Sequence, residues 1–422
     1  MRVILRKNTS VILISIFFAT SFLIVTVFNR IALAIVFFLF LFVLLLKIRQ
    51  STVKLNLAIE DLRILFLFYL FIIASFAVVG FFNLFFLGMS YIEYFPEKHG
   101  RMINIIIYLT IFLFIVNERN NGKISTKTLF RAYTTGCCIL LFFGLWQIFY
   151  FVFHVPFPNF ETRTHIHSTE DVFYLPFMTR RVTSIAREPA FLMPFLIDAI
   201  VILFYTTKKY LFIILFMLVL FYSLSLAGYV NIFLISTIML FIAKKTMKTH
   251  LIKIGVLLFG TYIFFLFQNV FVSVFQRLNP NALFTTGRLQ NSILSIRYML
   301  FEAPLFNIIF GFGPNGMGYI RNCIYETTGW LISVTTHVIF VDFFVEHGLI
   351  GVVVISLLFY NLFLLSTKVY SKTGNRLGQV LCLNLIITSL YTADFTSPRF
   401  TAIIILLLCL YKDIRNNRVV VK

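Results

Sequence analysis

Runs of about 20 mostly apolar residues recur along the whole chain, and a helix needs a run of that length to cross the hydrocarbon of a bilayer. Hydrophobic residues make up 60% of the 422 residues and charged residues only 12%, a composition far from that of soluble domains. The runs lack the alternation of outer-membrane strands, and backbone amides in lipid must bond within their own segment. The sequence therefore predicts an all-α, polytopic integral membrane protein.

About 12 transmembrane helices fit between the polar breaks, which puts both termini on one side of the membrane. The expected spans lie near residues 10–28, 31–46, 64–82, 102–116, 132–153, 189–205, 211–226, 228–243, 254–274, 349–366, 377–392 and 400–411. Lys and Arg in short loops stay in the cytoplasm during insertion. With the N-terminus inside, the cytoplasmic segments hold 24 of the 36 Lys and Arg residues. We expect one transmembrane domain over residues 1–422 in a bacterial cytoplasmic (inner) membrane, with both termini cytoplasmic.

The 12 basic residues on the predicted outer side are 11 Arg and one Lys, whereas the cytoplasmic segments hold 15 Lys and nine Arg. The planar guanidinium binds phosphate and carboxylate oxygens bidentately. An anionic ligand on the outer side would explain this selection; alternatively, topology depletes Lys while Arg fills structural salt bridges. Because the basic residues are distributed in this way over the two sides of a membrane, the net charge of +20 does not indicate a nucleic-acid partner. The five cysteines lack metal-ligand spacing, so neither a metal nor another cofactor is expected.

Two predicted periplasmic loops, residues 154–188 and 276–337, are much longer than the other loops. The second continues into a half-helix to residue 347. Long loops between packed elements are usually functional or disordered. These two carry aromatic residues and Gly/Pro punctuation rather than a disordered composition, so we expect them to be folded and functional.

The first long loop ends in a basic stretch directly before a span. If this stretch is helical, Arg180 and Arg187 share a face, and a phosphate there would also meet Arg181 and the free amides of the following helix. Pro189 is suited to the first position of that helix. The alternative is that these side chains snorkel or anchor the interface, with Glu188 as a partner of Arg187.

The second long loop contains Arg288, a predicted amphipathic helix through Ile296 and Leu300, and the glycine-rich run 311–318. The run satisfies the dinucleotide pattern G-x-G-x-x-G, but it follows no strand, so that interpretation fails on context. We expect instead a tight turn that lets the backbone approach a ligand or a neighbouring helix.

A half-helix that breaks at Gly348, followed by a full span, is predicted next. Asp342 and Glu346 are four residues apart and share a face of it, and carboxylates at the membrane boundary are costly unless paired. His337 points elsewhere around the helical wheel, so it either precedes the helix or serves another neighbour. A lone His is more often structural than catalytic.

These segments together resemble the superfamily of O-antigen polymerases and O-antigen ligases, which are polytopic glycosyltransferases. The resemblance is best in the latter half of the chain. It rests on Arg181–Pro189, Ser223-Leu-Ser225, Gly287–Leu289, Pro304–Gly313, His337 and Glu346–Gly351. One departure is Val338, which stands where the family pattern has Asn after the His.

The resemblance implies a metal-independent transfer of a glycan from undecaprenyl pyrophosphate to an acceptor sugar on the periplasmic side. Guanidinium groups would stabilise the leaving diphosphate in place of a metal, and the acceptor hydroxyl needs a base. The expected catalytic residues are His337, Glu188 and Arg288; the pyrophosphate-binding residues are Arg180, Arg181, Arg187 and Arg288; further candidates are Asp342, Glu346 and Arg321. Membrane lipid, a chain-length regulator and a flippase of the same pathway are the expected partners.

Three functions stay open. The first is a polymerase that joins lipid-linked oligosaccharide repeat units. The second is a ligase that moves finished glycan to a lipid A core. The third is a flippase for the lipid-linked oligosaccharide, which would need ionisable residues inside the spans. Only Asp198 lies clearly inside a predicted span, which argues against a transporter, and it could instead be a paired structural group.

Overall fold

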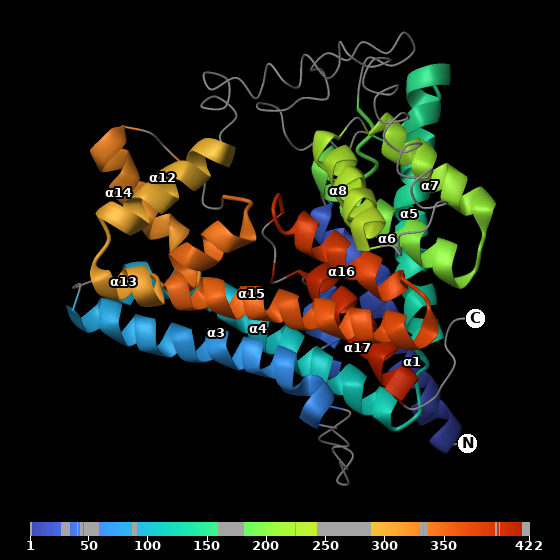
Figure 1. Ribbon diagram of the computed structural model, residues 1–422, viewed down its shortest axis with the longest axis horizontal. Coiled ribbons are helices and arrows are strands. Elements are labelled where there is room, and N and C mark those ends of the chain that lie inside the picture. Colours follow the sequence, from blue (N-terminus) through green and yellow to red (C-terminus); the bar gives the residue numbers. More distant parts are fainter. Residues whose placement is uncertain are drawn as a thin grey trace.

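Helices account for all the regular secondary structure in the described residues of the computed structural model (Figure 1), apart from one isolated bridge between Thr26 and Ala186. The structure describes residues 2–26, 34–39, 41–42, 45, 59–86, 91–158, 181–223, 225–242, 288–329, 332, 336–392, 395 and 397–415. Within these ranges the predicted all-α fold is confirmed.

The helices follow the predicted apolar runs and extend several of them, except within the predicted loop 276–337. They are α1 (Arg2–Thr20), η1 (Ser21–Val25), α3 (Ile59–Phe86), α4 (Tyr91–Asn120), α5 (Thr126–Phe153), α6 (Pro189–Thr206), α7 (Tyr210–Tyr222), α8 (Leu226–Ile242), α12 (Arg288–Phe301), α13 (Leu305–Phe310), α14 (Met317–Thr328), α15 (Ile339–Thr373), α16 (Leu377–Thr388) and α17 (Pro398–Arg415).

Four helical stretches among the described residues are long and apolar enough to cross a membrane: Met102–Asn120 of α4, and the helices α5, α6 and α15. Shorter apolar stretches lie in α1 and η1, α3, α7, α8 and α16. The predicted span 254–274 lies outside the described residues, and 31–46 is described only in part. The total of about 12 spans and the sidedness of the loops therefore stay predictions.

Helix α17 is enclosed by its neighbours and is buried almost throughout residues 398–410. It packs against α1, α4, α5, α15 and α16. Its last turn is tied to the α4–α5 turn by Arg119, which pairs with Asp413 and donates from Nη2 to the Cys409 carbonyl (2.9 Å) and from Nε to Thr126 Oγ1 (3.2 Å). In Figure 1 this end of the molecule also holds the start of α1, whereas α12, α13 and α14 lie at the opposite side.

Helix α15 breaks at Gly348, where φ is 64° and ψ is −162°. The break leaves two carbonyls without their helical donors, and amides of the glycine-rich run replace these donors. Phe312 N donates to Val345 O and Gly313 N to Glu346 O, both at 2.8 Å. A Cβ on Gly348 would lie 2.2 Å from the Ile309 carbonyl carbon, so only glycine lets the two backbones cross this closely. The half-helix, the break and the tight turn were all predicted, and the turn approaches a neighbouring helix.

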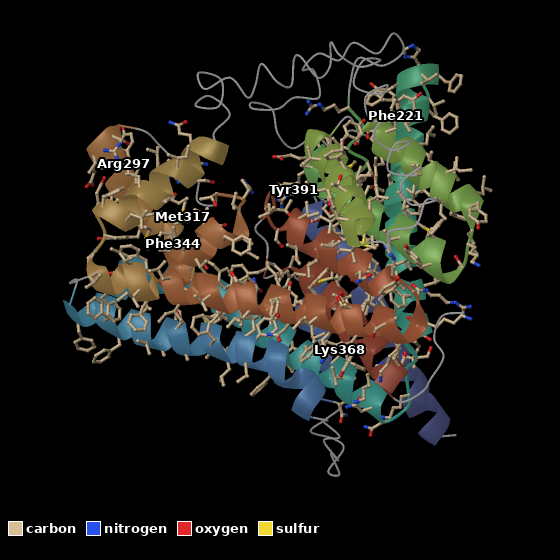
Figure 2. All side chains as sticks on the ribbon, viewed as in Figure 1. Phe221, Arg297, Met317, Phe344, Lys368 and Tyr391 are labelled. Atoms are coloured by element: carbon tan, nitrogen blue, oxygen red, sulfur yellow. The ribbon has the colours of Figure 1, made fainter. Side chains whose placement is uncertain are left out.

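Helices α12, α13 and α14 form a group with a core of its own, which we call the α12–α14 group. The apolar side chains of this core are Tyr298, Met299, Phe312, Met317, Ile320, Ile324, Ile332, Phe344 and Val345. Figure 2 shows Met317 and Phe344 within the group and Arg297 on its periphery. Because Phe344 and Val345 belong to the first half of α15, this half-helix joins the group to the main bundle. Helix α12 is the predicted amphipathic helix through Ile296 and Leu300.

Candidate functional site

The segment before α6 is an irregular stretch whose backbone is held by α5. Gln147 Oε1 accepts hydrogen bonds from the amides of Thr183 (2.8 Å) and Ser184 (2.7 Å). Ser184 adopts a positive φ of 57° and donates from its hydroxyl to the Leu140 carbonyl at 2.8 Å. Residues 182–186 are buried. The described residues 181–188 are not helical, because distant polar groups accept from the backbone amides that a helix would use. The condition under which Arg180 and Arg187 would share a helical face is therefore not met in this segment, and Arg180 itself lies outside the described residues.

Arg187 and Glu188 mark the passage from this segment into α6. Arg187 Nε donates to the Thr26 carbonyl at 3.1 Å, next to the bridge between Thr26 and Ala186. Glu188 has an extended backbone (φ −145°, ψ 150°) and occupies the position before the first helical residue. Pro189 begins the helix, as predicted. This hydrogen bond thus ties the guanidinium of Arg187 to Thr26, at the end of the first apolar helix.

The start of α15 is shaped by Asp342. Its Oδ1 accepts from the Thr336 amide (2.9 Å) and from the Thr336 hydroxyl (2.6 Å), and Ile339 N donates to the Ser389 carbonyl at 2.9 Å. His337 lies in the resulting turn with φ 63°, before the helix begins. The buried carboxylate of Asp342 therefore fixes Thr336, directly before His337, and the bond from Ile339 to Ser389 fixes the backbone that follows.

These two helix starts meet. The rings of Phe191, in the first turn of α6, and His337 lie 6.2 Å apart between centroids. Since Phe191 N donates to the Glu188 carbonyl at 3.1 Å, the His337 ring approaches the same turn that Glu188 and Arg187 lead into. We call the residues Arg187, Glu188 and His337 the loop junction. It joins the ends of the two long loops, which are 149 residues apart in sequence, counting from Glu188 to His337.

Glu346 occupies a different place from the loop junction. It lies at the break of α15, next to His347, whose Nδ1 is 2.9 Å from the Ser75 hydroxyl of α3. Both Glu346 and His347 are buried. The two carboxylates that were predicted to share a face thus have separate surroundings: Asp342 shapes the start of the half-helix, and Glu346 lies at its end.

The remaining candidates lie at three other positions in the chain. Arg288 is the first residue of α12, and its side chain is outside the described parts. Arg321 lies on α14, partly buried within the α12–α14 group. Arg181 is partly buried just before the irregular segment. Its charge interacts electrostatically with the Tyr229 hydroxyl of α8.

A buried polar network in the bundle was largely missed by sequence reasoning. Asp198 of α6 accepts from Arg399 Nε (2.8 Å), from the Tyr133 hydroxyl (2.7 Å) and from Asn384 Nδ2 (2.6 Å). Asn384 Oδ1 in turn accepts from Asn231 of α8 at 2.7 Å. The sequence suggested that Asp198 could be a paired structural group, and it is. Its partner was counted among the outer arginines, so for this residue the excess of Arg reflects a structural salt bridge.

The network continues towards the α15 start through Tyr391, whose hydroxyl lies 3.1 Å from Asn231 Nδ2. Figure 2 shows Tyr391 beside α8, on the side of the α12–α14 group. The signal that could have revealed the network is physical: a carboxylate inside an apolar span needs a cation from another span. Within the described residues, no three His, Cys, Asp or Glu side chains lie close enough together to hold a metal ion.

A scan against protein-family models finds no match for this chain, and a search of curated proteins finds no similar sequence.

Proposed function

We propose that this protein is an O-antigen polymerase, which joins oligosaccharide repeat units carried on undecaprenyl pyrophosphate at the periplasmic face of the membrane. The observation that supports it best is the contact between Phe191 and His337. It brings together the ends of two loops that carry the cations and the candidate bases. A transferase needs these groups at one place, because the acceptor must lose a proton as the leaving diphosphate gains charge.

In this proposal a hydroxyl of the acceptor sugar attacks the anomeric carbon of the donor. His337 or Glu188 takes the hydroxyl proton, a glycosidic C–O bond forms, and the C–O bond to the pyrophosphate breaks. The carrier lipid leaves as its diphosphate. Arg187 is suited to stabilise that charge, because its Nε bond to the Thr26 carbonyl limits the reorientation of the guanidinium. Arg181, Arg288 and the unplaced Arg180 are the other proposed pyrophosphate contacts.

The buried ion pair bears on the flippase alternative. A transporter would use ionisable residues exposed to a cavity between the spans. Asp198 is fully buried and bonded to Arg399, Tyr133 and Asn384. This pairing supports a structural role for the carboxylate, which was the one group that the predicted spans clearly offered to a flippase.

Deleting the gene and resolving the surface polysaccharide on a gel separates the three functions. A polymerase deletion leaves a single repeat unit on the lipid A core. A ligase deletion leaves no attached glycan, with finished chains still on the carrier. A flippase deletion leaves single repeat units on the carrier at the cytoplasmic face. Either of the last two outcomes would overturn the proposal.

The role of His337 is tested with the purified protein and lipid-linked repeat units. His337→Asn should lower the rate by about 100-fold or more, the usual contribution of a general base. His154→Asn is the matched control, because His154 is exposed, lies in the first long loop and also has a positive φ of 57°. Asn tolerates this backbone conformation. Equal rates for the two variants would remove His337 from the chemistry and leave Glu188, tested as Glu188→Gln.

Arg288→Lys tests the proposed bidentate contact with phosphate. Lys keeps the charge but not the planar fork, so the variant should lose much of the polymerising activity. Arg131→Lys on α5, where Arg131 is exposed, is the control. An unchanged chain-length profile for Arg288→Lys would exclude Arg288 from the site.

A further inference from the structure

Helix α12 exposes a mostly apolar stripe, where a helix on a water-soluble protein would expose polar residues. Its exposed stripe consists of Ile293, Ile296, Arg297, Leu300 and Phe301. These positions are spaced i, i+3, i+4, i+7 and i+8, so they share one face. The exposed fraction of Ile296 is 37% and that of Phe301 is 80%. We call these five residues the α12 stripe.

The opposite face of α12 is buried although much of it is polar. Asn291, Ser292 and Ser295 all lie there, and Ser295 is completely buried. The Ser295 hydroxyl is satisfied within the helix by the Asn291 carbonyl at 2.6 Å. A helix whose surroundings were water would turn Ile and Phe inwards and Ser and Asn outwards. The pattern instead fits a helix whose outer surroundings are apolar.

The group that carries the α12 stripe also adjoins exposed apolar side chains on α3. Phe306 of α13 stacks on Phe82 of α3, with centroids 3.6 Å apart and the ring planes inclined by 15°. Close to this contact, Phe81 and Phe85 of α3 are strongly exposed, and Leu305 of α13 has an exposed fraction of 73%. In Figure 1, α13 lies beside the end of α3, and α12 lies beyond α13. A helix as apolar as α3 exposes such side chains to lipid.

We propose that the α12 stripe rests in the interfacial region of the same bilayer that the apolar helices enter, at the level where α3 ends. Phospholipid is the partner that covers the stripe. The apolar side chains enter the boundary between headgroups and acyl chains, as in interfacial amphipathic helices. Arg297, in the middle of the stripe, extends its aliphatic stem along this surface and its guanidinium towards the headgroup phosphates. The second long loop is thus anchored to the membrane rather than projecting into water.

This anchoring depends on membrane insertion and does not rest on the proposed glycosyl transfer. It does have a consequence for that function: a helix lying along the interface holds Arg288, its first residue, near the plane in which lipid phosphates lie.

Tryptophan fluorescence in brominated vesicles tests the proposal. The chain has two Trp residues, and replacing both Trp146 and Trp330 with Phe gives a Trp-free background. Ile296→Trp and Phe301→Trp are then placed singly on the stripe, and Asn322→Trp, at an exposed polar position of α14, is the matched control. Each variant is reconstituted in phosphatidylcholine vesicles with or without bromine on the upper acyl carbons, after gel filtration confirms that it is monodisperse.

Emission from the stripe variants should fall by roughly half or more in brominated vesicles, because an interfacial helix enters about 5–10 Å into the headgroup and acyl boundary. Emission from the Asn322→Trp control should change little. Equal, weak quenching of all three variants would overturn the proposal. A blue-shifted but unquenched stripe would also overturn it, because protein rather than lipid would then cover α12. Since Phe301 is the most exposed apolar residue of the stripe, its variant provides the result if Ile296→Trp fails to fold.

Discussion

The ion pair between Asp198 and Arg399 should dominate the stability of the bundle when only one partner is removed. Both side chains are buried, with exposed fractions of 0% for Asp198 and 8% for Arg399, and Arg399 Nε lies 2.8 Å from Asp198 Oδ2. Breaking a buried pair from one side leaves an uncompensated charge and typically costs about 3–5 kcal/mol. The two single variants should differ within that range, because the partners carry unequal shares of the network.

Arg399→Met should fall near the lower end, at about 3 kcal/mol. The stranded carboxylate keeps two hydrogen bonds, one from the Tyr133 hydroxyl and one from Asn384 Nδ2. Asp198→Leu should cost about 5 kcal/mol or more, because it strands the guanidinium and also removes the acceptor of those two hydrogen bonds, at about 1–3 kcal/mol for each. The order of the two effects is therefore part of the prediction.

The double variant Asp198→Leu/Arg399→Met should be more stable than the sum of the single effects implies, by about 2 kcal/mol or more, since no buried charge remains. Unfolding in mixed micelles with a rising fraction of sodium dodecyl sulfate measures these free energies. Arg131→Met is the matched control, because Arg131 is exposed on α5, and it should change stability by less than about 0.5 kcal/mol.

Two results would refute this reasoning. The first is an Arg399→Met variant that unfolds like Arg131→Met, which would mean that the pair is not held in the buried geometry. The second is strict additivity in the double variant, which would mean that the two side chains do not interact.

Two further predictions concern the backbone of the site and use the same assay. Gly311→Ala should destabilise the protein by at least about 3 kcal/mol, because a Cβ there would lie 2.3 Å from the Glu346 carbonyl carbon at a φ of +80°. The control Gly374→Ala, at a similar φ but with open space around the Cβ, should cost only about 1–2 kcal/mol. Equal costs for the two variants would contradict the close crossing of the two backbones. Gln147→Leu should destabilise the protein by about 2–5 kcal/mol, because it removes the acceptor of two buried backbone amides. The control Gln379→Leu should not destabilise the protein, since the buried Gln379 amide has no hydrogen-bond partner among the described residues.

Signals that act within one turn of chain were read correctly from the sequence. Pro189 begins α6 because its ring suits the first helical position. Gly348 breaks α15 because it adopts a positive φ that other residues disfavour. The amphipathic spacing of α12 correctly predicted a helix, although the sequence could not tell which of its faces would be buried.

Signals that depend on distant partners were not readable. The segment before α6 was expected to be helical if regular, but Gln147 and the Leu140 carbonyl hold it in an irregular path from α5. Arg399 lies 201 residues after Asp198, and no periodicity relates the two positions. The same is true of His337 and Phe191. In each case the local pattern is compatible with several conformations, and tertiary hydrogen bonds or packing select one.

The double variant also separates stability from catalysis in α6. The start of α6 is fixed locally by Gln147 and by the bond from Arg187 to the Thr26 carbonyl, and Asn384 Nδ2 also reaches the Pro194 carbonyl at 3.2 Å. None of these contacts needs the ion pair. Where it folds, Asp198→Leu/Arg399→Met should therefore keep the proposed polymerising activity, with an unchanged chain-length profile on a gel. If the double variant folds stably in the membrane but makes no polymer, while His154→Asn remains active in the same assay, then the ion pair takes part in the site itself, because the loop junction would be intact and yet insufficient.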